Sequence, residues 1–411
     1  MSTAVSTSTI CGEAAIASPR VVSIDIFRGL TMAVMIFVNA LSSVRGLPWW
    51  TYHAHGSVNA MTYVDMVFSF FLFIVGMSLP LSIAQRLKRN PSIPALWGHV
   101  ALRSIGLVVL GLILANAENC DPARMPMNGF VWALLGLFSA SLYLNAYGKW
   151  ERFPAYSTVL RGLGLCGVVI LFMLFRRTAP GGHSAWINFA YPEILGLIGL
   201  TYLGAAILVI LTRRWRWAPA AWFAILALMS ALSSARVITW FHHLSLYIWP
   251  FGDGSLVSIV MAGALTSIIY LGAGHRFALR RAMTIAICFG LLALAAGTAL
   301  IPLGISKNRA TPTWCLYSIG ASVLSFTLLY WLCDVKKWTR WAFFVRSAGA
   351  NTLTTYLLPD FWYFLLGAAG LTFYDTHFSQ GWPGVVKTFV FTFFILGISW
   401  AITKVKVRLQ F

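Results

Sequence analysis

Apolar runs recur along the whole chain and are separated by short joins that contain Gly, Pro, Asn and charged residues. Most runs approach or reach the roughly 20 residues that an α-helix needs to cross the hydrocarbon core of a membrane. The pattern therefore predicts an all-α fold, a polytopic bundle of about twelve transmembrane helices, at residues 26–44, 62–84, 97–115, 129–147, 157–175, 191–211, 218–240, 253–272, 281–304, 313–333, 347–367 and 384–403. The short joins predict a single transmembrane domain over residues 20–411, preceded by a disordered cytoplasmic tail over residues 1–19.

The composition agrees with a membrane protein. Of the 411 residues, 59% are hydrophobic and 10% are charged, whereas about 25% are charged in an ordinary soluble protein. A formal net charge of +19 would indicate nucleic acid as the partner of a soluble chain, but here the basic residues belong to loops, and we expect membrane lipid as a partner and no nucleic acid. The six cysteines show no paired spacing, so neither a disulfide framework nor a metal site is indicated.

The distribution of basic residues predicts the orientation, because Lys and Arg are enriched in cytoplasmic loops. When the joins are assigned alternately to the two sides, 22 of the 30 Lys and Arg residues fall on one side and seven on the other, which leaves Arg236 inside a run. This asymmetry supports an even number of spans with both termini cytoplasmic. It also indicates a multi-pass protein of a cytoplasmic membrane.

The join after the first run carries the first candidate chemistry. It reads PWWTYHAHGSVN over residues 48–59 and lies on the predicted outer side. Trp49 and Trp50 are typical of the aromatic belt at a membrane surface. His53 and His55 stand beside them, and a histidine in an outer loop is usually only an exposed polar residue. The interpretation of these two histidines depends on the residues of the next apolar run.

That run begins with Asp65, ten residues after His55. A carboxylate at the start of a helix can simply complement the helix dipole, but an ionisable residue within an apolar span more often marks a functional site. Asn39 lies late in the first run, at the same predicted depth. Asn39, His55 and Asp65 can therefore converge, with the carboxylate orienting an imidazole that transfers protons near neutral pH and the amide holding a polar substrate group.

Several motifs, taken together in their order, resemble one family. They are SIDIFRG at residues 23–29, Asn39, HGSVN at residues 55–59, DMVF at residues 65–68, PEILGLIGLTY at residues 192–202, SIVMA at residues 258–262, SKN at residues 306–308 and GANTLTTY at residues 349–356. This order resembles the heparan-α-glucosaminide N-acetyltransferase family, a set of polytopic acyltransferases. The resemblance covers most of residues 20–403.

The resemblance implies that the chain carries acetyl from cytosolic acetyl-CoA to the amino group of a glucosamine-type sugar at the outer side of a bacterial inner membrane. It implies that His55 acts in acetyl transfer as a general base or as the acetyl carrier, with Asn39 and Asp65 beside it. Substrate contacts are expected from motif residues, namely Asn59, Lys307, Asn308 and Asn351. Arg28 and Arg103 stand nearest the spans with Asn39 and Asp65 and are the candidates for holding CoA phosphates, although positive-inside anchoring alone explains them equally well.

The chain also departs from the family pattern. No long segment precedes the first run, so we expect long polymeric substrates to be less suitable. Two runs, residues 129–147 and 157–175, are additional and have no assigned role. Leu358, Pro359 and Asp360 follow Tyr356 where the lysosomal members of the family have a Gly-His-Glu run, which leaves the function of that histidine in doubt here.

Two other functions remain open. A bundle of twelve helices is also a common plan for a secondary transporter of an amino sugar, often built from repeated halves, and no such halves are visible. An O-acetyltransferase of a surface glycan would keep the chemistry and change the acceptor. The histidine-bearing loop beside Asp65 favours an acyltransferase over a transporter. The exact acceptor and the oligomeric state, including a homo-oligomer, have no sequence signature.

Overall fold

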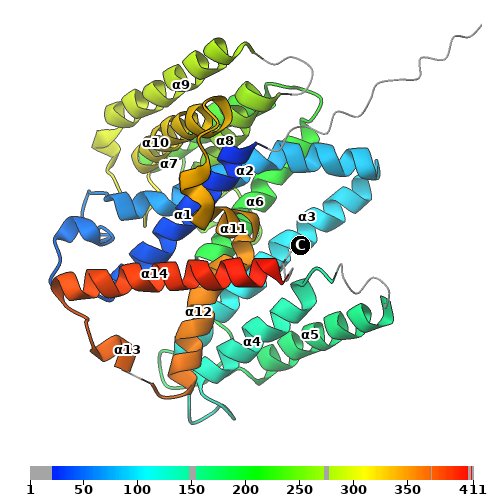
Figure 1. Cartoon of the computed structure of the whole chain (residues 1–411), viewed down its shortest axis with the longest axis vertical. Coiled ribbons are helices and arrows are strands. Elements are labelled where there is room, and N and C mark those ends of the chain that lie inside the picture. Colours follow the sequence, from blue (N-terminus) through cyan, green and yellow to red (C-terminus); the bar gives the residue numbers. More distant parts are fainter. Residues whose placement is uncertain (1–20, 148–153, 273–276, 372, 406–408, 410–411) are drawn as a thin grey trace, which may run out of the picture.

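The computed structural model describes residues 21–147, 154–272, 277–371, 373–405 and 409, so the predicted tail lies outside the described residues. Helices make up nearly all of its regular structure (Figure 1). They are α1 (Val22–Leu41), α2 (Tyr63–Arg89), α3 (Ile93–Asn116), α4 (Gly129–Leu144), α5 (Pro154–Leu174), α6 (Glu193–Leu211), α7 (Ala218–Ser234), α8 (Ser255–Leu271), α9 (Leu279–Ala299), α10 (Pro312–Tyr330), α11 (Phe343–Ala350), α12 (Thr352–Ala368), α13 (Phe373–Thr376) and α14 (Gly381–Lys404). A short outer hairpin pairs β1 (Arg177–Thr178) with β2 (Ser184–Ala185).

The helices confirm the predicted fold class, a helical membrane bundle. Within the described residues, eight helices are long and apolar enough to cross a membrane, and α4, α7 and α8 are shorter apolar helices. Every predicted apolar run contains a helix. Arg236, which the prediction placed inside the run at residues 218–240, lies instead in the turn after α7, where its backbone is left-handed (φ 59°).

The predicted run at residues 347–367 is not one continuous helix. It is broken at Asn351, whose φ of −129° and ψ of 55° separate α11 from α12. The side chain of Asn351 accepts a hydrogen bond from Thr354 Oγ1 at 2.7 Å, and its carbonyl oxygen accepts one from Thr355 Oγ1 at 2.9 Å. Asn351 is thus the residue at which α11 ends and α12 begins. A single uncharged polar residue within the run does not signal such a break in the hydrophobic pattern.

Close helix packing at two glycines holds α2 in the centre of the bundle. A Cβ atom on Gly76 would stand 1.9 Å from the carbonyl oxygen of Val260 on α8, and one on Gly263 would stand 2.0 Å from the carbonyl oxygen of Phe73. Only glycine permits such an approach, as is common where membrane helices pack backbone to backbone. This contact fixes the position of α2, which carries the candidate residue Asp65 in its first turn.

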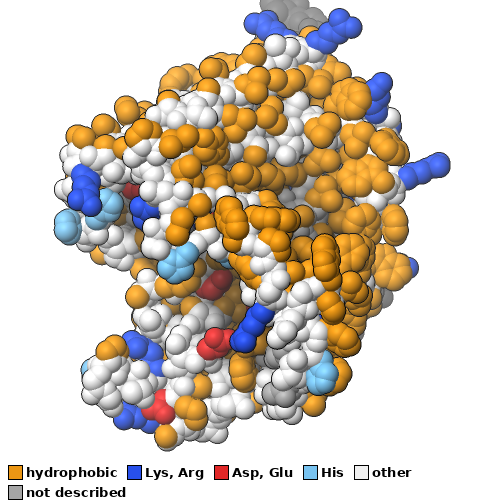
Figure 2. Space-filling model, turned by 90° about the vertical axis from the view of Figure 1, so that its left-hand side faces the viewer, with side chains coloured by type: hydrophobic (Ala, Val, Ile, Leu, Met, Phe, Trp, Pro, Cys, Tyr) orange, Lys and Arg blue, Asp and Glu red, His pale blue; other side chains and the backbone are white. Residues whose placement is uncertain are grey.

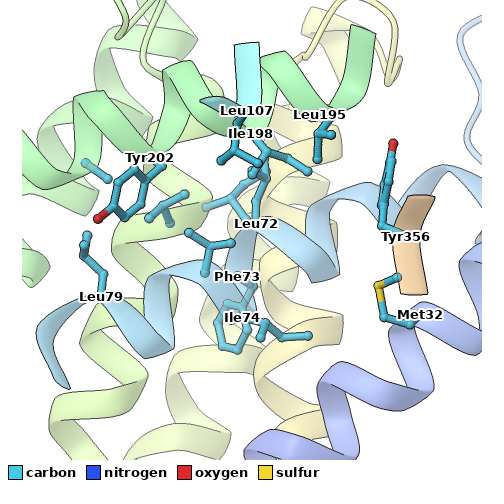
Figure 3. Packing of buried hydrophobic residues seen from close by; sticks show 14 of the residues in the cluster. Met32, Leu72, Phe73, Ile74, Leu79, Leu107, Leu195, Ile198, Tyr202 and Tyr356 are labelled. Atoms are coloured by element: carbon cyan, nitrogen blue, oxygen red, sulfur yellow. The ribbon is translucent and has the colours of Figure 1, made fainter. Parts of the chain in front are cut away.

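The largest hydrophobic cluster lies between α2, α3, α6, α8, α10 and α12. Figure 3 shows its centre, where side chains of α2, α3 and α6 meet and Tyr356 on α12 faces the same interior. Trp132 of α4 donates a hydrogen bond to the Leu171 carbonyl of α5 at 2.8 Å. At the edge of the bundle, α4 packs on α12, and α5 packs on the far side of α4 (Figure 1). The additional helices therefore extend the bundle away from its central helix.

Candidate active site

The carboxylate of Asp65 organises the loop of residues 42–62, which we call the histidine loop. Asp65 lies in the first turn of α2, and its side chain is 1% exposed. It accepts hydrogen bonds from the backbone N–H of Thr62 (3.0 Å) and of Ala54 (3.2 Å), and it contacts Nδ1 of His53 at 2.7 Å. Asp65 therefore caps the start of α2, and the same carboxylate also contacts the imidazole of His53.

This contact determines which nitrogen of His53 is available. An imidazole N–H that bonds to a carboxylate fixes the tautomer, so Nδ1 of His53 carries the proton that it donates to Asp65. In the neutral imidazole with this tautomer, Nε2 is the hydrogen-bond acceptor. The His53 side chain is 40% exposed, whereas that of Asp65 is buried. An oriented, accessible imidazole with a buried carboxylate behind it is the arrangement of a general base.

The structure corrects the predicted partner of Asp65. His55 was expected to receive that carboxylate, but its Nδ1 instead lies 2.7 Å from the hydroxyl of Ser57, in an exposed part of the loop. The residue two positions earlier, His53, occupies the contact because the loop turns back so that the backbone of Ala54 also binds Asp65. The motif spacing that selected His55 does not indicate how the irregular loop folds back onto Asp65.

Lys307 approaches the same imidazole from a second loop, residues 304–311, which we call the lysine loop. Its Nζ lies 3.4 Å from Nδ1 of His53. Burial lowers the pKa of Lys307, and the nearby carboxylates of Asp65 and Glu193 oppose this by favouring the ammonium form. The lysine loop also contacts the histidine loop through Arg309, which donates a hydrogen bond to the side chain of Asn59. Two loops far apart in sequence thus meet at one imidazole.

A small pocket of about 30 Å³, here called the waist, lies directly at these residues. Asn39, His53, Lys307 and Tyr356 line it together with apolar side chains. The hydroxyl of Tyr356 donates a 3.4 Å hydrogen bond to Glu193 at the start of α6, where the backbone of Glu193 is left-handed (φ 58°). The predicted convergence thus brings Asn39 to the same pocket as the imidazole held by Asp65, with His53 as that imidazole.

The inner cavity, of about 360 Å³, opens at the helix ends where basic residues are concentrated. Arg28, Arg86, His99 and Arg103 line it. Arg28 donates hydrogen bonds to Ser78 Oγ at 2.7 Å and to the carbonyl oxygen of a glycine in α11 at 3.3 Å. The two predicted arginines, Arg28 and Arg103, therefore share one cavity, and Arg86 and His99 are cationic or titratable partners that the sequence did not single out.

The outer cavity, of about 620 Å³, lies on the other side of the waist. Its lining shares Phe68, Ile194 and Lys307 with the waist, and the waist shares Phe71, Ile198 and Tyr356 with the inner cavity. Figure 2 looks onto the left-hand side of Figure 1 and shows a hollow with acidic, basic and histidine side chains at its surface. The three spaces thus form one series from the basic helix ends to the outer loops.

The predicted substrate residues divide between these spaces. Lys307 and Asn308 line the outer cavity, and Asn59 lies beside them as the partner of Arg309. Asn351 does not join them, because it lines the inner cavity with the arginines. Asp360 lies one residue after Pro359 within α12. Within the described residues, no group of three or more His, Cys, Asp or Glu side chains has a metal-binding arrangement.

Comparison with known proteins concerns the first part of the chain. Residues 20–132 match the family described as "Heparan-alpha-glucosaminide N-acetyltransferase, catalytic". The resemblance to this family is confirmed. A relative of that name from Homo sapiens is 39% identical over 114 residues, and one from Mus musculus is 37% identical over 113 residues. The matched stretch contains Asn39, both loop histidines and Asp65.

The match to the heparan-alpha-glucosaminide N-acetyltransferases is local. Each aligned stretch covers 26% of this chain and 16% of the relative. It includes Arg28 and Arg103 of the inner cavity but ends before α6, the lysine loop and α12. The motifs at residues 192–202, 258–262, 306–308 and 349–356 therefore stay predictions from resemblance, while the geometry connects three of them, those at residues 192–202, 306–308 and 349–356, with the waist.

Proposed function

We propose that this protein is a transmembrane acetyltransferase that moves acetyl from acetyl-CoA on the basic side to the amino group of a glucosamine-type sugar on the outer side. The observation that carries this proposal is the position of the His53–Asp65 pair at the waist, between an arginine-lined cavity and an outer cavity. The names of the relatives support the reaction class and the type of acceptor.

The inner cavity suits the nucleotide end of acetyl-CoA. Guanidinium groups bind phosphate oxygens through paired N–H donors, and the side chains of Arg28, Arg86 and Arg103 surround this space. A bond from Arg28 to Ser78 and another to the backbone of α11 already hold its guanidinium in place. An acyl-pantetheine arm that starts here passes Phe71 and Tyr356, which line both cavity and waist, to reach His53.

The chemistry at the waist needs an unprotonated Nε2 on His53. In direct transfer, Nε2 takes a proton from the attacking amino group while the nitrogen bonds to the thioester carbon. The C–S bond then breaks, and the CoA thiolate receives a proton from the imidazolium. In the two-step alternative, Nε2 itself attacks the carbonyl carbon, the C–S bond breaks and CoA leaves as its thiolate. The amine then attacks the acetyl-imidazole, the bond between Nε2 and the acetyl carbon breaks, and the proton that the amine loses passes through Nε2 to the CoA thiolate. Asp65 stabilises the cationic imidazole in both, and Lys307 lies where it can stabilise the carbonyl oxyanion.

A transporter is less compatible with the waist. Its volume of about 30 Å³ is far below the roughly 300 Å³ at the lower end of small-molecule sites, so a sugar ring does not pass through it in this conformation. A transferase needs only the acetyl group and the amine to meet there. O-acetylation of a surface glycan keeps every step except the identity of the attacking atom and is separated by testing hydroxyl acceptors.

The decisive experiment uses the full chain purified in detergent with acetyl-CoA and glucosamine, and follows release of free CoA. We expect release that requires the amino sugar, and a loss of about 100-fold or more in His53→Ala, the scale typical of a lost general base. His183→Ala is the matched control, because His183 is an exposed outer-side histidine in the turn between β1 and β2.

His55→Ala tests the assignment that the resemblance makes. A severe loss in His55→Ala with near-normal transfer in His53→Ala would return the role to His55. Normal transfer in both variants would remove histidine from the mechanism. Sugar flux into liposomes without acetyl-CoA, together with no CoA release, would replace the transferase with a transporter.

A further inference from the structure

The outer cavity contains a carboxylate that the proposed acetyl transfer does not use. Asp253 lies in the turn before α8, between Gly252 and Gly254, whose left-handed backbones (φ 52° and 90°) form the turn. Its Oδ1 accepts hydrogen bonds from the N–H of Ser255 at 3.0 Å and from the hydroxyl of the same residue. The side chain is therefore fixed at the wall of the cavity.

Asp253 has no cationic partner of its own among the residues that the structure describes. No Lys or Arg nitrogen of this set lies within 4.0 Å of its carboxylate. Of the two basic side chains that line the same cavity, Arg309 bonds to Asn59, and Lys307 also lines the waist, with Nζ 3.4 Å from Nδ1 of His53. Burial raises the pKa of Asp253, and the bonds from Ser255 and the nearby His242 oppose that rise. A partly buried carboxylate without a Lys or Arg partner favours a cationic ligand.

The walls of the same cavity are aromatic. Phe68, Tyr191, Phe241 and Phe251 line it. One face of a pyranose ring consists of C–H bonds and packs on aromatic rings, while its hydroxyl groups need polar partners, which His242 and Asn308 supply. A volume of about 620 Å³ lies within the 300–1,000 Å³ typical of small-molecule sites. The chemistry of the cavity therefore matches a cationic sugar of one or two rings.

We propose that the outer cavity is a selective site for an amino sugar in its ammonium form, with Asp253 as the counter-ion that distinguishes it from a neutral sugar. This inference rests on the proposed function and adds the residue that determines acceptor selectivity. The shared wall of Phe68, Ile194 and Lys307 then brings the bound sugar beside the waist. Because Lys307 is itself basic, the amino group reaches the waist more readily after it has lost its proton.

The test measures binding of D-glucosamine and of D-glucose to the full chain by titration calorimetry without acetyl-CoA. We expect the wild type to prefer glucosamine by about tenfold or more, since a charged hydrogen bond is lost with glucose. Asp253→Asn should bind both sugars with similar, weak affinity. Asp253→Glu, which keeps the carboxylate, should retain a preference for glucosamine.

Asp121→Asn is the matched control, because Asp121 is an outer-side aspartate that bonds to Thr178 and pairs with Arg124 away from the cavity. Glucose binding by Asp253→Asn shows that the variant is folded. A preference for glucosamine that survives in Asp253→Asn, or no preference in the wild type, would overturn the inference.

The same proteins separate this inference from the proposed function. If glucosamine binds in an Asp253-dependent way but no acetyl is transferred, the site stands and the transferase fails. If acetyl is transferred and the KM for glucosamine is unchanged in Asp253→Asn, the transferase stands and the site fails.

Discussion

At the scale of single residues, Asp253 predicts a pH dependence of acceptor binding. Its pKa is raised by burial, so its carboxylate becomes protonated at a higher pH than an ordinary aspartate does. Glucosamine affinity should therefore decline as the pH falls toward this raised pKa, while the amine itself stays protonated. Titration calorimetry across mildly acidic pH measures the effect, and Asp253→Asn should show no such decline.

The raised pKa of Asp253 makes stability and glucosamine binding depend on pH in opposite directions. The folded protein holds the Asp253 proton more tightly than the unfolded chain, so the contribution of this residue to stability falls as the pH rises through the ordinary aspartate range. Low pH thus favours folding at this position and disfavours ammonium binding. If glucosamine affinity does not change with pH in the wild type, Asp253 is not its counter-ion.

The candidate residues show which parts of the site could be read from the sequence. The costs of a carboxylate in an apolar span and the family motif both led to Asp65, and Asn39 followed from helix depth. The family motif selected His55, whereas the structure places His53 against Asp65. The folding of an irregular loop leaves no periodicity in the sequence from which its contacts can be predicted. The sequence did not mark Asp253 as a site residue for another reason. A carboxylate in a loop is usually solvated, and the aromatic walls around Asp253 come from segments that are distant in the sequence.

At the scale of helices, α1 is held at its start by a residue of another element. Asp334, in the π-helical turn that follows α10, accepts hydrogen bonds from the backbone N–H of Val22 at 3.2 Å and of Ser23 at 2.9 Å. These are two of the N–H groups that a helix leaves without partners in its first turn. The carboxylate also complements the positive end of the helix dipole.

Asp334→Ala should therefore destabilise the protein by about 0.5–2 kcal/mol, the range for a lost helix cap. Thermal unfolding of the full chain in detergent should show a lower Tm for Asp334→Ala and a smaller decrease for Asp334→Asn, which keeps one acceptor oxygen. An unchanged Tm in the alanine variant would mean that water satisfies both N–H groups equally well.

Helix positions were predictable because apolar runs of membrane length have few other folded solutions. The interruption at Asn351 was not, since it is a local change in backbone angles at one uncharged residue. Residues 350–352, where the two helices meet, line the inner cavity, and Arg28 bonds to the carbonyl oxygen of Gly349 beside them.

At the scale of the whole molecule, the uneven distribution of charge matches the arrangement of the cavities. The helix ends that carry most Lys and Arg residues surround the inner cavity, and the loops with the histidines surround the outer one. No residue of α4 or α5 lines the inner cavity, the waist or the outer cavity within the described residues. The additional helices are thus outside the route, and the route runs between α1, α2, α6 and α12.

Tyr356 lies on the proposed route, because it lines both the inner cavity and the waist. We expect Tyr356→Trp to block the passage of the acyl arm with its larger ring. Acetyl transfer should fall by about 100-fold, the effect of a small misplacement of reacting groups, while CoA still binds in the inner cavity. CoA release and calorimetry with CoA measure the two effects separately.

Two further variants identify the cause. Tyr356→Phe removes only the hydroxyl that bonds to Glu193. If acetyl transfer falls in Tyr356→Trp but not in Tyr356→Phe, the size of the ring is the cause. Tyr363→Trp makes the same substitution on the same helix, at a residue that bonds to Glu118 outside the route, and should transfer acetyl normally. If Tyr356→Trp also transfers acetyl at the wild-type rate, the acetyl group does not travel between α6 and α12, and donor and acceptor must then meet from the same side of the membrane.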